Sequence, residues 1–279
     1  MSQRARVDAV TRHDAGGART DPDLVAVEAP LEVVVVQAPD LAARSLGLLM
    51  RTPGDDGDLA RGLLYTEGVV DTPADVLSVE IDVRDATDRP ARAVVAVSAR
   101  LDLEERLPRR ALSGTSACGL CGRLALRALD QGRPHTHAAP RIAASVIAGL
   151  PARLQAGQIV FADTGGLHGA ALCDLSGAPW LLREDVGRHN AVDKVVGAAF
   201  AAGRLPAPDA LLAVSGRVAY EIVQKAVAAG VAAVIAVGAP SSLAVDAARA
   251  TNLTLVGFAR DGRFNVYAGV ERIVSTSAI

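Results

Sequence analysis

Two cysteines spaced two residues apart are the groups in this 279-residue sequence best suited to chemistry. Cys118 and Cys121 lie in residues 113–122, a segment rich in glycine and serine that predicts an accessible loop. If the residues that follow form a helix, both thiols lie at its N-terminus, where exposed N–H groups favour the thiolate over the thiol. Because a thiolate is the form that attacks sulfane sulfur or a disulfide, the pair predicts sulfur chemistry or metal binding.

Zinc binding and thiol redox exchange are the two alternatives to sulfur transfer. A structural zinc site needs four ligands, and His135 and His137 would have to complete it with a gap shorter than zinc fingers use. A thioredoxin-like site needs a strand directly before the motif, which residues 111–115 resemble poorly. The third cysteine, Cys173, lies in an apolar run, which predicts a buried core thiol.

A histidine in a glycine-rich segment, His168, is the second candidate for chemistry. Nucleobase deaminases carry an acidic residue two positions after their histidine, whereas this sequence has Ala170 there. The carboxylate needed for proton transfer is therefore missing, so deaminase activity is not expected and only a deaminase-like scaffold remains open. The simpler interpretation of His168 is a loop histidine that only forms hydrogen bonds.

Basic residues stand beside predicted strand ends and a helix start at three places. Arg188 and His189 open a predicted helix, and Arg217 follows a predicted strand at 210–214. The third place closes another predicted strand and contains Phe258, Ala259, Arg260, Asp261, Gly262 and Arg263. Guanidinium groups bind phosphates bidentately, and an aspartate can accept hydrogen bonds from a guanine edge. A solvated turn or cap explains each place equally well alone, but the three together favour a phosphate-containing ligand.

Periodicity divides the chain into an arm and two folded parts. Residues 1–29 show no sustained period and are predicted to be a flexible arm. Residues 30–112 are predicted to be a small α+β domain, followed by the cysteine loop and linker at 113–139. Within the small domain we expect strands at 33–36, 76–83 and 92–99 and helices at 40–50 and 58–68.

The last part, residues 140–279, alternates between helical and strand patterns. Helices are predicted at 141–156, 190–202, 220–229 and 242–250, and strands at 171–175, 180–182, 210–214, 232–237 and 253–258. Strand runs without a polar face are typical of a sheet covered on both sides. The pattern predicts a layered α/β/α domain, so that the whole chain is an α/β protein (α+β overall).

Composition excludes several classes of partner. The formal net charge is −2, from 29 basic and 31 acidic residues, and only 3% of residues are aromatic, so we expect no nucleic-acid partner. No apolar run approaches ~18 residues, so we expect no membrane span. The odd number of cysteines and the lack of a signal-peptide pattern favour the cytoplasm.

Taken together, the motifs resemble those of the formate dehydrogenase accessory sulfurtransferase family, FdhD. The resemblance runs in the family's order from Arg51 to Tyr267 and covers most of the chain. It rests on the stretches RTPGDDGDLARGLLYTEG, TSACGLCG, FADTGGLHGAAL, REDVGRHNAVDKVVG, SGRVAYEIVQKA, APSSLAVDAA and VGFARDGRFNVY. Each stretch alone is weak evidence, whereas the ordered set is highly specific.

The resemblance implies a cytoplasmic sulfur carrier with sulfurtransferase activity. A cysteine desulfurase would load sulfane sulfur onto Cys118, with Cys121 assisting. The sulfur would then pass to a molybdenum bis(guanine dinucleotide) cofactor before its insertion into formate dehydrogenase. The family's cofactor contacts correspond to residues 258–263, and no zinc is expected.

The same resemblance implies a homodimer and a second domain similar to cytidine deaminases. The sequence departs from the family pattern at Gly169, where many relatives carry alanine. We expect that departure to have little effect.

Overall fold

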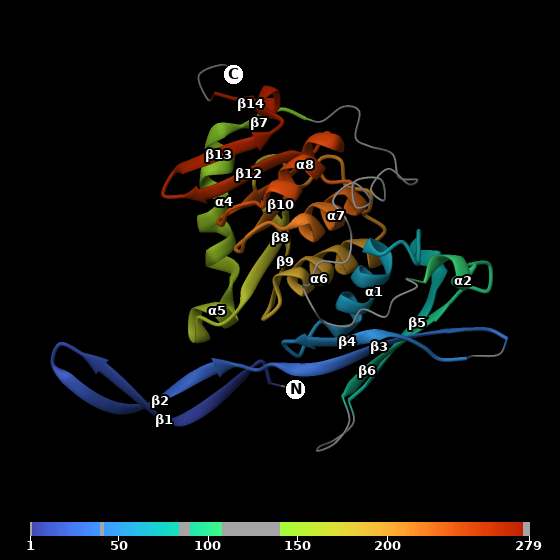
Figure 1. Ribbon diagram of the computed structural model, residues 1–279, viewed down its shortest axis with the longest axis horizontal. Helices are drawn as coiled ribbons and strands as arrows, with labels where there is room; N and C mark the ends of the chain where they lie inside the picture. The colour runs from blue at the N-terminus through green and yellow to red at the C-terminus, as the bar shows by residue number, and fades with distance from the viewer. Residues whose placement is uncertain (1, 40–41, 84–89, 108–139, 276–279) are drawn as a thin grey trace.

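The computed structural model describes residues 2–39, 42–83, 90–107 and 140–275 of the chain (Figure 1). Both cysteines of the loop, Cys118 and Cys121, lie outside the described residues, as do His135, His137 and the short helix considered after Gly122.

A small four-stranded sheet forms the first folded part, in the order β4-β3-β6-β5. Its elements are β3 (Ala29–Gln37), β4 (Arg44–Arg51), α1 (Asp56–Thr66), η1 (Pro73–Asp75), β5 (Val76–Asp82), β6 (Ala91–Val97) and α2 (Leu103–Arg106). Strands β3 and β6 are parallel and the other pairs antiparallel. Alternate residues of β6, including Ala93 and Val95, are buried toward α1, as the two-residue period of a strand requires.

The predicted helix at 40–50 is wrong, because β4 occupies most of that range and pairs antiparallel with β3. Its apolar residues fit both a helical and a strand period. In the structure Leu48 and Met50 are exposed while Leu49 is half-buried and Arg51 buried, which is the alternation of a strand. Leu46 is buried on the same face as Leu49 because the register shift beside Gly47 adds one residue to the strand. Gly47 lies at a register shift with φ of 144°, a backbone conformation that a helix cannot use. The other small-domain strands and α1 lie within a few residues of their predicted positions.

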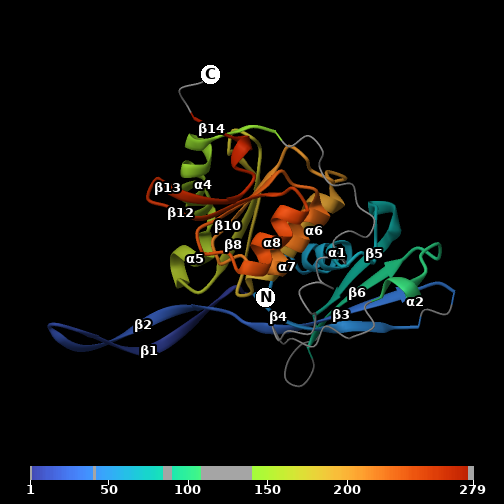
Figure 2. The same ribbon diagram turned by 45° about the horizontal axis from the view of Figure 1, so that its top comes forward.

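The N-terminal arm, predicted without regular structure, is a β-hairpin. It consists of β1 (Arg4–Asp14) and β2 (Gly17–Ala26), which among the described strands pair only with each other and extend away from the rest of the molecule (Figures 1 and 2). Most of its residues are exposed, so its sequence has no apolar face by which a strand could be recognised. An ion pair between Arg4 and Asp163, with 2.6 Å between Nε and Oδ2, joins its base to the second part.

A mixed six-stranded sheet with the order β13-β12-β11-β10-β8-β9 is the centre of the second part. Its strands are β8 (His168–Cys173), β9 (Pro179–Asp185), β10 (Leu211–Val214), β11 (Ala233–Ala236), β12 (Thr254–Arg260) and β13 (Arg263–Ala268). The helices are α4 (Ala144–Gly157), α5 (Ile159–Thr164), α6 (Arg188–Ala201), α7 (Tyr220–Ala229), α8 (Ser242–Ala250) and η2 (Val270–Arg272). Strands β7 (Ile142–Ala143) and β14 (Ile273–Val274) form a separate short pair.

Helices cover both faces of this sheet, which confirms the predicted layered architecture. Helix α4 packs on one face and α6, α7 and α8 on the other (Figure 2). The predicted helices and strands of this part are confirmed with differences of a few residues at their ends. Within the described residues, no helix combines the length and apolar character needed to cross a bilayer.

Helix α1 of the small sheet crosses α6 at very short distance. A Cβ atom on Gly62 would overlap the backbone carbonyl of Asp193, and one on Gly197 would overlap the backbone carbonyl of Asp58. The obstacle is backbone in both cases, so no side-chain rearrangement makes room. Residues of both sheets, such as Val33 of β3 and Leu172 of β8, therefore belong to one hydrophobic cluster with Leu64 of α1 and Val195 of α6.

We predict that Gly197→Ala destabilises the protein by about 3 kcal/mol or more, because its methyl group has no space at the helix crossing. Gly149→Ala is the matched control, since Gly149 lies inside α4 with no neighbour within 4 Å of an added Cβ. That control should stabilise by roughly 0.5–1 kcal/mol, the usual gain from replacing a helical glycine. Urea unfolding of both variants checks the difference, and equal effects would contradict it.

Candidate functional site

The carboxyl ends of three parallel strands bring several predicted residues to one edge of the large sheet. Strands β10, β11 and β12 are parallel, and Ser215, Val237 and Arg260 stand at or just after their ends. Strand β8 is antiparallel to β10, so its first residue, His168, lies at the same edge. This is where open α/β sheets bind ligands.

A cavity of about 730 Å³ lies at this edge, between the strand ends and α4 and α5. Its walls are partly apolar, with Pro151, Leu154, Phe161 and Leu167 among them. The polar and charged residues that line it are Gln155, Gln158, His168, Ser215, Arg260 and Asp261. Its volume lies within the range of small-molecule sites.

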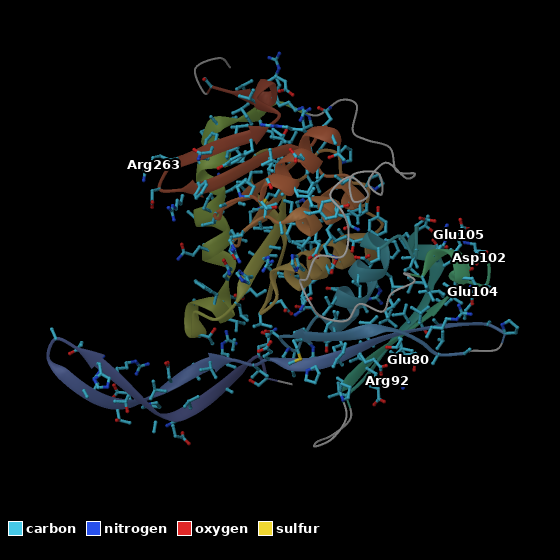
Figure 3. The ribbon with its side chains drawn as sticks, in the orientation of Figure 1. Glu80, Arg92, Asp102, Glu104, Glu105 and Arg263 are labelled. Carbon is cyan, nitrogen blue, oxygen red and sulfur yellow. The ribbon has the colours of Figure 1, made fainter. Side chains whose placement is uncertain are left out.

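Only half of the predicted segment 258–263 lines the cavity, namely Arg260, Asp261 and Gly262. Ala259 is buried in the core beneath α4. Arg263, 83% of whose side chain is exposed, lies at the outer end of the β12–β13 hairpin (Figure 3). Phe258 has a φ of +53°, a conformation that aromatic residues rarely adopt, and its N–H donates to the Gly238 carbonyl at 3.1 Å.

The structure places Arg188 and Arg217 near His168 rather than in the cavity wall. Burial lowers the pKa of His168 below its usual value, and the positive charges of Arg188 and Arg217 act in the same direction. Gly216 lets the backbone after β10 lie close to the His168 ring, because a Cβ at residue 216 would lie 3.2 Å from His168 Nδ1. His168 is therefore a neutral imidazole near pH 7, beside two guanidinium groups.

Several polar residues near Arg188 form buried contacts between β9, α6 and the small sheet instead of facing solvent. Asp185 and Lys194 form a fully buried ion pair, with 2.8 Å between Oδ2 and Nζ. Asp185 also accepts hydrogen bonds from the backbone N–H of Thr52 and from Asn190 Nδ2, at 3.1 and 2.9 Å. A solvated cap, the simpler interpretation of this segment, therefore does not describe Asp185, Asn190 or Lys194.

The neighbouring residue, Glu184, fixes the start of α5. Its carboxylate accepts the backbone N–H groups of Val160 and Phe161 at 2.9 and 2.8 Å. These are among the N–H groups that a helix leaves without partners, so an anionic acceptor stabilises the helix start. The cavity wall formed by α5 is thus attached to β9.

The motif that begins at Arg51 anchors the small sheet to the same network. Arg51 is fully buried and donates two hydrogen bonds to Asp56, at 2.7 and 2.9 Å, and one to the Ala29 carbonyl at 3.0 Å. The next residue, Thr52, accepts a hydrogen bond from Lys194 Nζ at its carbonyl, 2.9 Å away. The motif therefore has a structural role in joining β4 and α1 to α6.

His189 points toward α7, where its Nε2 lies 3.1 Å from Glu221 Oε2 without hydrogen-bond alignment. Burial, together with the charges of Arg188 and Lys225, lowers the pKa of His189 to about 4. The effect of burial outweighs the attraction of the nearby Glu221 carboxylate, which is half exposed. His189 is therefore neutral near pH 7.

The prediction that Cys173 is a core thiol is confirmed. Its side chain lies in the cluster beneath α4, and the residue is 1% exposed. Burial and the charge of Asp174 raise the pKa of its thiol to about 11. Cys173 is thus a poor nucleophile at neutral pH.

No pattern in the sequence pointed to Gln158, which the structure places in the cavity wall. It lies between α4 and α5 and is 3% exposed, and its Nε2 has no hydrogen-bond partner among the described residues. Its side chain lies against Gly169, the residue whose departure from the family pattern was expected to have little effect. An alanine Cβ at 169 would lie 2.6 Å from Gln158 Cδ, so the glycine is required for this arrangement.

Comparison with known proteins gives one consistent result. Residues 26–274 match the model of the FdhD/NarQ family. A sulfur carrier protein FdhD of Nocardia farcinica is 46% identical over 276 residues, covering 96% of this chain and 95% of the relative. The protein of the same name from Anaeromyxobacter sp. strain K is 48% identical over 262 residues, covering 90% and 88%.

Among solved structures, the chain is similar to a provisionally assigned formate dehydrogenase accessory protein from Desulfotalea psychrophila. The TM-score is 0.73 and the alignment covers 98% of this chain and 100% of the other. Because the identity is 22%, this likeness supports the fold alone.

We predict that His189 makes the protein less stable in mild acid. In the unfolded chain His189 has a pKa of about 6.5 and binds a proton before the native side chain does, so stability falls as the pH drops from 6.5 toward 4. His189→Gln removes this contribution and should flatten the fall by up to about 1.4 kcal/mol per pH unit. Urea unfolding across this range checks it; parallel curves for the two proteins would show that His189 does not titrate as described.

Proposed function

The chain belongs to the FdhD/NarQ family, and on that premise we propose that it is a sulfur carrier in the maturation of formate dehydrogenase. A cysteine desulfurase is the sulfur donor, Cys118 bears the persulfide, and Cys121 assists. The acceptor is a molybdenum bis(guanine dinucleotide) cofactor, the cargo that formate dehydrogenase receives. The observation that carries the proposal is the Cys118–Cys121 pair in a chain that matches the family along residues 26–274.

Loading of Cys118 is an exchange in which no net oxidation occurs. The Cys118 thiolate attacks the terminal sulfur of the desulfurase persulfide, forming a new S–S bond while the old one breaks. The desulfurase cysteine leaves as a thiolate. The Cys121 thiolate then attacks the inner sulfur of the Cys118 persulfide, so a Cys118–Cys121 disulfide forms while the outer sulfur leaves as sulfide for the cofactor, and the cysteine pair supplies the two electrons. Cys173 takes no part, because it is buried and its pKa is raised.

The cavity supports a guanine nucleotide as the part of the cargo that the protein binds. Arg260 supplies a guanidinium group for phosphate, and Arg188 and Arg217 add positive charge near His168. The cavity volume of about 730 Å³ suits one nucleotide arm of the cofactor. The apolar walls on α4 suit a planar base.

We predict that incubation with a cysteine desulfurase and cysteine adds about 32 Da, the mass of one sulfur atom, to the protein. Cys118→Ala should abolish the adduct, whereas Cys173→Ala, the matched control, should retain it because that thiol is buried. Intact-mass spectrometry measures the adduct. Loss of the adduct in Cys173→Ala alone, or stoichiometric zinc bound through both loop cysteines, would contradict the proposal.

We predict that Arg260→Ala weakens binding of GDP by roughly 10-fold or more, because a charge-assisted hydrogen bond to phosphate is lost. Arg263→Ala should have a smaller effect, since Arg263 lies outside the cavity wall and is mostly exposed. Titration calorimetry of both variants gives the affinities. Equal GDP affinity in Arg260→Ala and the wild type would remove this residue from the ligand site.

A further inference from the structure

The carboxamide of Gln158 is a buried polar group with an unmet hydrogen-bonding requirement. The residue is 3% exposed and lines the cavity, and its Nε2 has no acceptor among the described residues. Buried side-chain donors in folded proteins nearly always have a partner, because a donor removed from water without one costs free energy. A ligand bound in the cavity can supply the missing acceptor.

Gly169 holds Gln158 in this place. Residue 169 lies on the α4 side of β8, since Ala171, two positions along the strand, packs in the cluster beneath α4. A Cβ at 169 would lie 2.6, 2.8 and 2.9 Å from Cδ, Nε2 and Cγ of Gln158. Only glycine leaves room for the side chain to lie against the strand, so the two residues form a matched pair.

The surroundings of Gln158 favour a flat heterocycle over a phosphate. Pro151, Leu154 and Leu167 contribute apolar wall, and Gln155 adds a second carboxamide. The guanidinium groups of Arg188 and Arg217 act on His168 and are not among the residues that line the cavity. The unpartnered atom of Gln158 is the donor Nε2, which can pair with an acceptor such as O6 of a guanine base but not with the amino group at the same position of adenine.

We propose that Gln158 is a specificity-determining residue that hydrogen-bonds the edge of a guanine base bound between α4 and the start of β8. The inference rests on the proposed function, which supplies a guanine nucleotide as ligand. It assigns the recognition of the base to Gln158 and the binding of the phosphates to Arg260. The other candidate for recognising the base is Asp261, which also lines the cavity.

The test compares the binding of GDP and ADP to the full chain by titration calorimetry. The wild type should prefer GDP, because the two bases present opposite donors and acceptors at position 6. Gln158→Met keeps the size of the side chain without its hydrogen-bonding groups, so GDP binding should weaken roughly 10-fold while ADP binding changes less than about 2-fold. The preference for guanine is thereby lost.

A second variant, Gly169→Ala, displaces Gln158 without changing its chemistry and should cause the same loss. The double variant should lose no more than either single variant, because both act through one contact. Arg260→Ala should weaken GDP and ADP equally. Thermal unfolding confirms that each variant is folded.

The outcomes separate this inference from the function on which it rests. If the wild type binds no GDP, the proposed ligand fails. If GDP binds and depends on Arg260 but Gln158→Met keeps the preference for guanine, the ligand survives and the role of Gln158 is overturned. Loss of the preference in Asp261→Asn alone would likewise overturn it and move the recognition of the base to Asp261.

Discussion

The close crossing of α1 and α6 determines how the two sheets pack together. Gly62 and Gly197 bring two backbones together so tightly that neither position can carry a side chain. Polar contacts reinforce the crossing: the Thr66 hydroxyl donates to Asp193 at 2.9 Å, and Lys225 donates to the same carboxylate at 2.9 Å. Helix α7, which carries Lys225, is thereby joined to α1 and α6. The small sheet and the large sheet consequently share one core and hold each other in place.

The candidate site depends on this arrangement because its frame is built from the same residues. Asp185, at the end of β9, and Lys194, in the middle of α6, are buried against each other, and both form hydrogen bonds with Thr52, the residue that follows β4. Arg188 follows directly and lies beside His168. The buried Asp185–Lys194 pair therefore positions Arg188. Both partners of the pair are fully hydrogen-bonded, which is the condition under which buried ion pairs are tolerated in a protein interior.

Much of the large sheet could be predicted from the sequence, because buried strands such as 232–237 are apolar throughout and their helices have clear apolar periods. Strand β4 could not, since Leu46 and Leu49 are spaced as on a helix, and a strand brings both to one face only through the register shift beside Gly47. The position of Arg260 and Asp261 at the end of a predicted strand identified them as ligand-binding candidates. The same argument applied to Ala259, which in the structure faces the core. Gln158 could not be found, because its place depends on contact with a glycine eleven residues later. The roles of Cys118 and Cys121 stay predictions.

The hydrogen bonds between Glu184 and the start of α5 affect access to the cavity. Because two backbone N–H groups donate to one carboxylate, moving α5 outward breaks two charge-assisted hydrogen bonds at once. The turn that contains Asp261 and Gly262 also lines the cavity and is exposed to solvent. Among the described residues, no pair of hydrogen bonds like that of Glu184 holds it in place. We therefore expect a ligand to enter the cavity past the β12–β13 turn, while α5 stays in place as a rigid wall.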